Sequence, residues 1–345
     1  MRLLVLGGTS FLGWHTVAQA LRRGWQVTTF NRGQAGPDAE GVEVVRGDRT
    51  SGRDLEQLAD RAFDVVVDTC GFVPAMARQA MEVLAAVPGR RPQYVYVSSI
   101  SAVETWPERP TPADAEARAC PSDAGPDSGG YGELKAGCER AVSELFPDSA
   151  TLVRAGAILG PYENVNRLPW WLARMERGGE VLAPGDPDMA MQLIDARDIA
   201  TFMLDCGEQR TSGTFSVTGP RGNATMRTWL EACRDGGGGG AALRWVPDDV
   251  LLAHDVEQWT ELPLWIARGT GSDHVWDVDT APAEAAGLRC RAVEETVLDT
   301  WSWMRESGYR PGASPHPHIA RSGIDPDKEA RVLAAAAAAE SSTGG

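Results

Sequence analysis

Short apolar runs alternate with longer helical patterns through the first half of the chain. The first run, residues 3–6, contains no polar residue, which is typical of a strand buried on both faces of a parallel sheet. A helical pattern follows over residues 11–23 and stops at Gly24, a residue that suits the position just after a helix. Further strands are expected at 26–30, 42–46, 64–68 and 94–98, with helices at 54–60 and 74–87. This alternation predicts an α/β fold with a doubly wound parallel sheet and right-handed crossovers.

The pattern changes after residue 104. Residues 105–130 contain five prolines and many Asp and Gly residues, which predicts a long loop. A helix is expected at 131–145 and a strand at 151–154. Beyond Gly160 and Pro161 the pattern is mixed, with helices expected at 168–177, 196–206, 226–234, 280–286 and 293–306 and short strands near 193–194 and 215–217. The run of glycines at 236–240 predicts a flexible linker, and Asp325-Pro326 marks the start of an Ala-rich helix.

Composition narrows the possible functions. Hydrophobic residues make up 43% and charged residues 23% of the 345, as in a globular protein. Lys and Arg number 33 against 48 Asp and Glu, and the formal charge of −15 argues against a nucleic-acid partner, which would need cations. No apolar run approaches the roughly 20 residues of a membrane span, so no membrane association is expected. The six cysteines and five histidines lack metal-ligand spacing. We therefore expect no metal site and a reducing, cytoplasmic setting.

A glycine-rich loop, Gly7-Gly8-Thr9-Ser10-Phe11-Leu12-Gly13, lies between the first expected strand and helix. A strand that leads into a helix brings several backbone N–H groups and the positive helix end to one point, where a pyrophosphate fits. Gly7 allows the tight turn, and Gly13 allows close helix–strand packing. Ser10 stands where many such loops have a third glycine, and its small side chain leaves room for phosphate. The loop therefore predicts a dinucleotide-binding site.

Three later segments strengthen this prediction: Tyr131-Gly132-Glu133-Leu134-Lys135, residues 193–200 and residues 213–219. In this order they resemble the short-chain dehydrogenase/reductase superfamily, and above all its extended and atypical members of the NAD-dependent epimerase/dehydratase type. The resemblance covers about residues 1–305. It implies a Rossmann-type domain over residues 1–160 and a smaller mixed α/β substrate-binding region over residues 161–311, with the sheet partly shared. Residues 312–345 would be a loose tail that ends in the Ala-rich helix.

The resemblance also implies which residues bind the cofactor. Asp48 would contact the adenine, whereas Cys70 and Gly71 would line the ribose and nicotinamide side. The expected cofactor-binding residues are Gly7, Thr9, Ser10, Phe11, Leu12, Gly13, Asn31, Arg32, Asp48, Arg49, Cys70, Gly71, Ser98, Tyr131, Lys135, Ala155 and Gly156.

The end of the second expected strand bears on the choice of dinucleotide. NAD-selective sites usually have a carboxylate there for the ribose 2′-hydroxyl. This chain has neutral Asn31 and then cationic Arg32, which can pair with a 2′-phosphate. The pattern favours NADP(H) and leaves NAD(H) open. Arg32 as a solvated surface charge, or stacked on the adenine, is the alternative interpretation.

Tyr131, Lys135 and Ser99 are the expected catalytic residues. Hydride transfer to a carbonyl needs a proton donor, and a phenol with an ordinary pKa near 10 serves if a cation brings that pKa closer to neutral. Lys135 lies one helical turn after Tyr131 and can supply the charge. Ser99, with Ser98 as the second choice, would polarise the substrate carbonyl. The family's usual aromatic residue after these serines is absent, because Ala102-Val103-Glu104 stands there.

The first functional hypothesis is an NADPH-dependent reductase that acts on a carbonyl of a small metabolite or sugar-like substrate. The second is an NAD(P)-dependent epimerase or dehydratase of a nucleotide sugar that holds its cofactor tightly. A third, a non-catalytic RNA-binding relative, is disfavoured by the net charge. Arg154, Arg167, Arg174 and Arg177 are available for a diphosphate, but no motif identifies the substrate. The expected partner is a small-molecule substrate, and a homodimer is one option for assembly.

Overall fold

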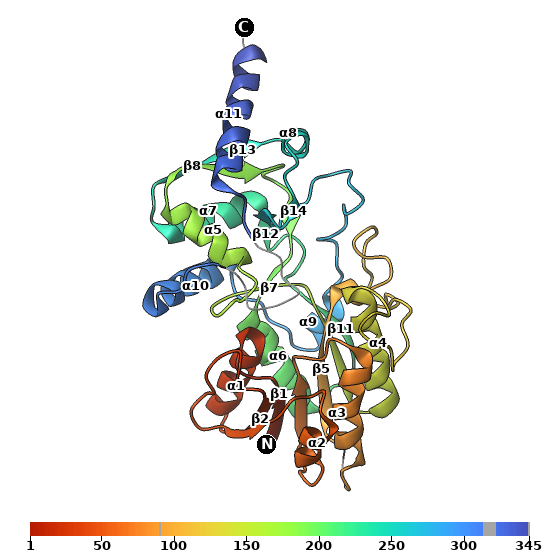
Figure 1. The fold of residues 1–345 in the computed structure, drawn as a ribbon. Coiled ribbons are helices and arrows are strands. Elements are labelled where there is room, and N and C mark those ends of the chain that lie inside the picture. The colour runs from red at the N-terminus through yellow and green to blue at the C-terminus, as the bar shows by residue number, and fades with distance from the viewer. Residues whose placement is uncertain (90, 313–321, 344–345) are drawn as a thin grey trace. The chain divides into compact units, whose positions relative to one another are not determined.

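The computed structural model describes residues 1–89, 91–312 and 322–343. The chain folds into two compact units (Figure 1). The first unit combines residues 1–158, 194–220 and 277–290. The second combines residues 159–193, 221–276 and the chain from residue 291 onward. No helix in the described ranges is both long enough and apolar enough to cross a membrane.

The first unit contains the predicted doubly wound parallel sheet. Its strands are β1 (Arg2–Leu6), β2 (Gln26–Asn31), β3 (Glu43–Arg46), β4 (Val65–Asp68), β5 (Gln93–Ser99), β6 (Ala150–Ala155) and β11 (Gly213–Val217). They are ordered β11-β6-β5-β4-β1-β2-β3, and every neighbouring pair is parallel. The order reverses between β1 and β4, which is where such sheets bind their ligands, beyond the carboxyl ends of the strands.

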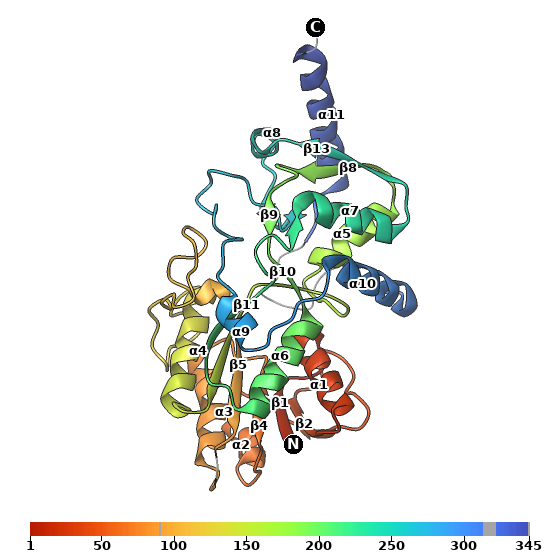
Figure 2. The same ribbon diagram turned by 180° about the vertical axis from the view of Figure 1, so that it is seen from behind.

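Helices cover both faces of this sheet. Leu3, Val5 and Val67 pack with α1 (Phe11–Arg22) and α6 (Ala196–Gln209), which Figure 2 shows side by side. Leu4 and Leu6 face the opposite core, where α3 (Pro74–Ala86) and α4 (Tyr131–Leu145) pack. The side chains alternate because successive residues of a strand point to opposite faces. The remaining helical segments of this unit are α2 (Gly52–Leu55), η1 (Glu56–Leu58), η2 (Ile100–Ala102) and α9 (Ala281–Ala285).

The predicted long loop between β5 and α4 is anchored at several points. Val103 and Ala117 form an antiparallel bridge, and Thr111 pairs in parallel fashion with Val278. Ile100, Val103 and Val278 form a small apolar cluster beneath this segment. The segment therefore has a core of its own, despite its proline-rich composition.

The second unit is a smaller mixed α/β structure. Its helices are α5 (Arg167–Glu176), α7 (Met226–Gly237), α8 (Asp248–Ala253), α10 (Val293–Ser307) and α11 (Pro326–Thr343). Its strand pairs are β8 (Gly179–Pro184) with β13 (Ala241–Val246), β9 (Ala190–Met191) with β12 (Ala224–Thr225), and β14 (Gln258–Trp259) with β15 (Leu262–Pro263). A further pair, β7 (Ala157–Leu159) with β10 (Leu193–Asp195), lies where the chain passes from one unit to the other along the sequence.

The glycine run at 236–240 corrects one prediction. Gly236 and Gly237 form the last turn of α7, and Gly238 ends that helix in the left-handed conformation with φ 62°. A Cβ atom at Gly239 would lie 2.3 Å from the Met175 carbonyl oxygen. The prediction of a flexible linker is therefore wrong, because the glycines form a helix end packed against α5.

The tail contains the predicted Ala-rich helix as α11, whereas residues 313–321 lie outside the described residues. Buried Glu329 of α11 binds Arg174 of α5 with N–O distances of 2.8 and 2.9 Å. Glu329 also accepts a hydrogen bond from Leu182 N of β8. Arg174 is thus committed to an internal ion pair.

Candidate active site

The glycine loop connects β1 to α1. Gly7 and Gly8 have φ values of 107° and 97°, which favour glycine strongly. A Cβ atom at Gly7 would lie 2.7 Å from Thr69 Oγ1, and one at Gly13 would lie 2.9 Å from Gly8 N. Helix α1 therefore starts in close contact with the loop, as the sequence predicts for Gly13. This cradle of backbone at a helix N-terminus fits the pyrophosphate of a dinucleotide.

Asn31 and Arg32 lie at the end of β2. Asn31 is buried, and its amide oxygen accepts a hydrogen bond of 2.8 Å from Gly33 N. Arg32 is 61% exposed, with Nη1 3.8 Å from Asp48 Oδ2. Hydrogen bonds from Thr50 hold the pKa of Asp48 below its ordinary value. Ionised Asp48 therefore lies beside the cationic side chain of Arg32, where the neighbouring strands β2 and β3 end.

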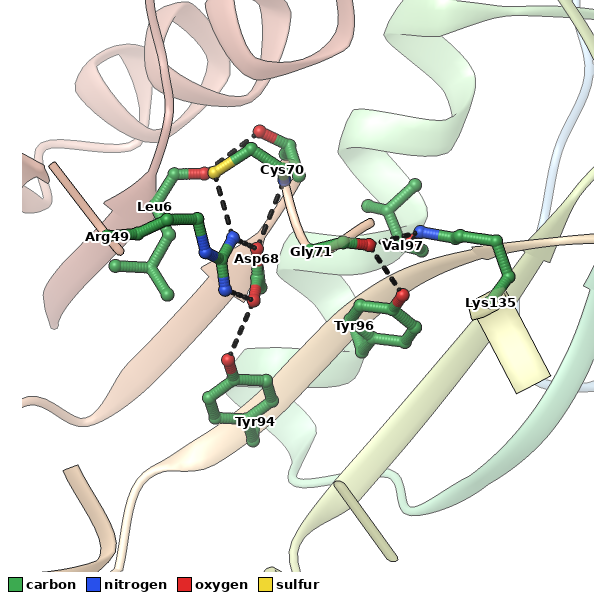
Figure 3. A network of polar contacts seen from close by, with 10 residues as sticks. Leu6, Arg49, Asp68, Cys70, Gly71, Tyr94, Tyr96, Val97 and Lys135 are labelled. Carbon is green, nitrogen blue, oxygen red and sulfur yellow. Dashed lines mark hydrogen bonds and ion pairs between the residues drawn. The ribbon is translucent and has the colours of Figure 1, made fainter. Parts of the chain in front are cut away.

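A buried ion pair supports the end of β4 (Figure 3). Arg49 donates two hydrogen bonds of 2.9 Å to the two carboxylate oxygens of Asp68. Asp68 also accepts hydrogen bonds from Tyr94 and from Cys70 N. Burial opposes the ionisation of Asp68, but these contacts outweigh it and hold its pKa below the ordinary value. Burial raises the pKa of the Cys70 thiol, so Cys70 is poorly suited to act as a nucleophile.

The guanidinium of Arg49 thus faces Asp68, although the sequence predicts it in the cofactor-binding set. Arg49 Nη1 lies 3.0 Å from Cys70 Sγ, so Arg49 contacts the segment of residues 70–71. Its geometry makes it a support for the segment that Cys70 and Gly71 would present to a cofactor.

Lys135 lies in the adjacent network, on α4. The residue is 2% exposed, and its amine donates hydrogen bonds to the carbonyls of Gly71, at 2.8 Å, and Val97, at 2.6 Å. The Tyr96 hydroxyl donates to the same Gly71 carbonyl, and the amine lies 4.4 Å from the centre of the Tyr96 ring. Lys135 therefore joins the ends of β4 and β5 (Figure 3). Burial lowers its pKa to about 8.

We expect Lys135→Met to change how stability depends on pH. Between pH 8 and the ordinary lysine pKa of 10.5, the unfolded chain retains a proton that folded Lys135 has lost. Raising the pH in this range should stabilise the wild type relative to the variant by up to about 1.4 kcal/mol per unit. Below pH 8 the difference should stay constant. Urea unfolding of both proteins from pH 7 to pH 10 measures this difference in stability.

Lys328→Met is the matched control, since it removes the amine that pairs with Glu261. Parallel pH profiles for wild type and Lys135→Met would contradict the assignment of this titration to Lys135.

The two candidate serines of β5 have different partners. Ser98 Oγ donates a hydrogen bond of 2.5 Å to buried Glu139. Glu139 is in turn paired with Arg154 at 2.8 Å, and Arg154 also donates to the Ala115 carbonyl. Ser99 Oγ accepts a hydrogen bond from Ser101 N at the start of η2. Ser98 is thus committed to a buried network, and Arg154 is not positioned as a free diphosphate-binding cation.

Tyr131 is the first residue of α4 and is 50% exposed. The turn that carries it packs tightly against η2, since a Cβ atom at Gly132 would lie 2.2 Å from the Ser101 carbonyl oxygen. Arg118 holds this junction. Its guanidinium donates to the carbonyls of Ser101 and Trp106 and lies 3.2 Å from Glu133 of the first turn of α4.

Ala155 and Gly156 follow at the end of β6, where a Cβ atom at Gly156 would lie 2.4 Å from Thr218 Oγ1. The structure thus brings the glycine loop, the ends of β2 to β6 and the start of α4 together in one unit. The supporting residues Asp68, Tyr94, Tyr96, Arg118 and Glu139 were not predicted. Each acts through partners distant in sequence, so no local motif signals it.

The sheet order and the glycine loop define the chain as a doubly wound α/β protein with a dinucleotide-type phosphate cradle. A sequence profile of the NAD dependent epimerase/dehydratase family matches residues 3–217, more than half of the chain. The chain belongs to this family.

Individual relatives are more distant. The Chloroplast stem-loop binding protein of 41 kDa b from Arabidopsis thaliana is 25% identical over 256 residues, which cover 69% of this chain and 63% of that protein. The chain therefore matches less than two thirds of that relative's length. UDP-glucose 4-epimerase from Thermotoga maritima, solved with UDP-glucose, has a TM-score of 0.66 at 16% identity, covering 90% of this chain and all of the other. WbmH from Bordetella bronchiseptica, solved with NAD+, has a TM-score of 0.68 at 14% identity, covering 89% and 99%. At these identities, the TM-scores show that the three structures share a fold.

Proposed function

We propose that this protein is a nicotinamide-dinucleotide-dependent epimerase or dehydratase that acts on a nucleotide sugar. The link between the glycine cradle and α4 carries the proposal, because Lys135 binds the Gly71 carbonyl and a Cβ atom at Gly7 would lie 3.8 Å from Cys70 Sγ. Tyr131 lies on α4 with Lys135, and Ser99 lies on β5 with Val97, whose carbonyl Lys135 also binds. Family membership supports it, as do the ligands with which the structural neighbours were solved, NAD+ and UDP-glucose. These comparisons favour this function over the net reductase that the sequence suggested first.

The residues of the cradle would hold the dinucleotide. Backbone N–H groups at the start of α1 would bind the pyrophosphate. Gly7, Gly8 and Gly13 allow the tight packing that shapes this backbone, since a Cβ atom at these positions would lie 2.7, 2.9 and 2.9 Å from a neighbouring protein atom. Arg32 and Asp48 would flank the adenosine. When bound, the nicotinamide supplies a reversible hydride acceptor.

Tyr131 would exchange a proton with the substrate hydroxyl or carbonyl during this chemistry. Its position at the exposed end of α4 allows contact with a substrate, whereas Lys135 is buried one turn further along. Lys135 provides positive charge and fixes the Gly71 and Val97 carbonyls that shape the site. Ser99 would donate a hydrogen bond to the substrate oxygen, since Ser99 Oγ is the acceptor in its hydrogen bond with Ser101 N.

The experiment is mass spectrometry of the nucleotide released from the purified protein, followed by incubation with UDP-sugars and trace dinucleotide. A new sugar isomer or a dehydrated product without net cofactor consumption supports the proposal. Stoichiometric NADPH oxidation with a carbonyl substrate would instead support the reductase. A salt-dependent shift of labelled RNA, with neither activity, would support the RNA-binding alternative.

NADP(H) remains our proposal for the preferred dinucleotide, and Arg32→Ala tests it. The variant should lose on the order of 1.5–3 kcal/mol of NADP(H) affinity, because a charge-assisted contact to the 2′-phosphate disappears. NAD(H) affinity should change little. Parallel titrations measure both, with Arg61→Ala, paired with Glu43 at the opposite end of β3, as the control. Equal losses for the two dinucleotides would refute the role of Arg32.

A further inference from the structure

A second arginine reaches the end of β2. Arg46 is the last residue of β3 and lies directly beside Asn31 in the parallel register. Its guanidinium donates a hydrogen bond to the Asn31 amide oxygen and packs over Gly33, where a Cβ atom would lie 3.0 Å from Arg46 Nε. The side chain is 49% exposed. Arg46 therefore stands beside Arg32 at the place where a dinucleotide's 2′-substituent is read.

Asp38 forms an ion pair with the guanidinium of Arg46. Both terminal nitrogens of Arg46 bind the Asp38 carboxylate, one of them at 3.0 Å from Oδ1 and the other in a close contact with Oδ2. Asn31 Nδ2 donates to the same Oδ1 at 3.2 Å. The hydrogen bond from Arg46 holds the pKa of Asp38 below its ordinary value, so the carboxylate is ionised at neutral pH.

The segment that carries Asp38 also contacts the phosphate cradle. A Cβ atom at Gly36 would lie 2.5 Å from the Thr9 carbonyl oxygen, so the 33–38 segment folds back onto the glycine loop. The segment that carries Asp38 thus contacts the end of β2 through Asn31 and the cradle through Gly36. This position is fixed by backbone contacts at Gly36 and by the register of β3 at Arg46.

We propose that Asp38 is a specificity-determining residue for the dinucleotide, because it holds Arg46 in an ion pair and limits the attraction of the site for a 2′-phosphate. This inference rests on the proposed function for the presence of a dinucleotide. The ionised Asp38 both neutralises the second cation and repels a phosphate that approaches Asn31. Arg32 is then left as the main cation for a 2′-phosphate, and removing the Asp38 charge frees Arg46 to join it.

The test is a set of dissociation constants for NADP+ and NAD+ at one low ionic strength. Asp38→Asn keeps the shape and the contact to Asn31 but removes the charge. It should tighten NADP+ binding on the order of tenfold relative to NAD+, the effect of one additional charge-assisted contact. The double variant Asp38→Asn/Arg46→Met should lose this gain. Arg46→Met alone leaves an unpaired carboxylate and should weaken NADP+ relative to NAD+.

Glu43→Gln is the matched control. It removes a carboxylate from the start of β3, the strand that ends at Arg46, where Glu43 pairs with Arg61. The ratio of the NADP+ and NAD+ dissociation constants should stay unchanged. Asp38→Ser repeats the charge removal with a different side chain if Asp38→Asn folds poorly.

An unchanged ratio in both Asp38 variants, or a gain that persists without Arg46, would overturn the inference while leaving the proposed function intact. A wild-type protein that binds neither dinucleotide would overturn both.

Discussion

Tyr131→Phe should lower turnover by roughly 10²–10⁴-fold, the contribution of a positioned general acid or base. The change removes one oxygen from a half-exposed ring at the start of α4 and leaves the packing of Gly132 against η2 untouched. Affinity for the dinucleotide should barely change, because the cradle and Arg32 lie on other elements. Steady-state kinetics with the identified substrate and a cofactor titration measure the two effects separately.

Tyr162→Phe, which alters another partly exposed tyrosine in the second unit, controls for the loss of a phenol as such. Ser99→Ala should reduce turnover with little loss of stability, whereas Ser98→Ala should act mainly on stability through Glu139. Near-normal turnover of Tyr131→Phe would defeat the proposed mechanism. A reversed ranking of the serines would only move the substrate contact by one residue.

The largest expected effect on stability is that of Arg49→Met. This change leaves the carboxylate of Asp68, which is fully buried, without its ion-pair partner. Removing one member of a buried pair costs about 3–5 kcal/mol, since the remaining charge is uncompensated. Urea unfolding at pH 7 should show this loss.

The pH dependence of the stability loss in Arg49→Met tests whether the unpaired Asp68 carboxylate causes it. In the wild type the lowered pKa of Asp68 contributes stability above its ordinary value of 3.8, and this contribution is lost as pH falls through the folded-state pKa. In Arg49→Met, burial without the arginine should raise that pKa, so the deficit should shrink as pH falls and the carboxyl becomes neutral. Asp68→Asn in the same background should recover part of the loss at pH 7. A deficit that is constant from pH 4 to pH 7 would contradict this explanation.

The elements that depend on local patterns were predictable from the sequence. The apolar run at residues 3–6, the glycine loop and the helix at 131–145 all appear in the structure, because burial on both faces and helical periodicity leave a direct mark on the sequence. Strands β8 and β13 were not predicted, since neither alternates: β8 buries its last four residues in succession, and β13 buries only its two end residues.

The candidate site likewise contains residues that local sequence patterns predict and residues that they do not. Tyr131 and Lys135 follow from a spacing within one helix, and Gly7 and Gly13 from a loop between two elements. The contacts of Asp38 were missed because they depend on a turn that returns to β2 and on a partner from β3. Ser98 was expected near the cofactor, but the long-range contact with Glu139 directs its hydroxyl into a buried network. Such contacts become visible only once the topology is known.

The placement of β11 and α6 late in the sequence affects how the first unit can fold during synthesis. A ribosome that has released only the first 158 residues has produced six of the seven strands, while β6 still lacks its outer neighbour β11. The side of the sheet against which α1 and α6 pack is covered by α1 alone until residues 196–209 emerge. A nascent or truncated chain of this length exposes a backbone edge and an apolar face, both of which promote aggregation. A fragment cut at residue 158 is therefore a poor choice for expression.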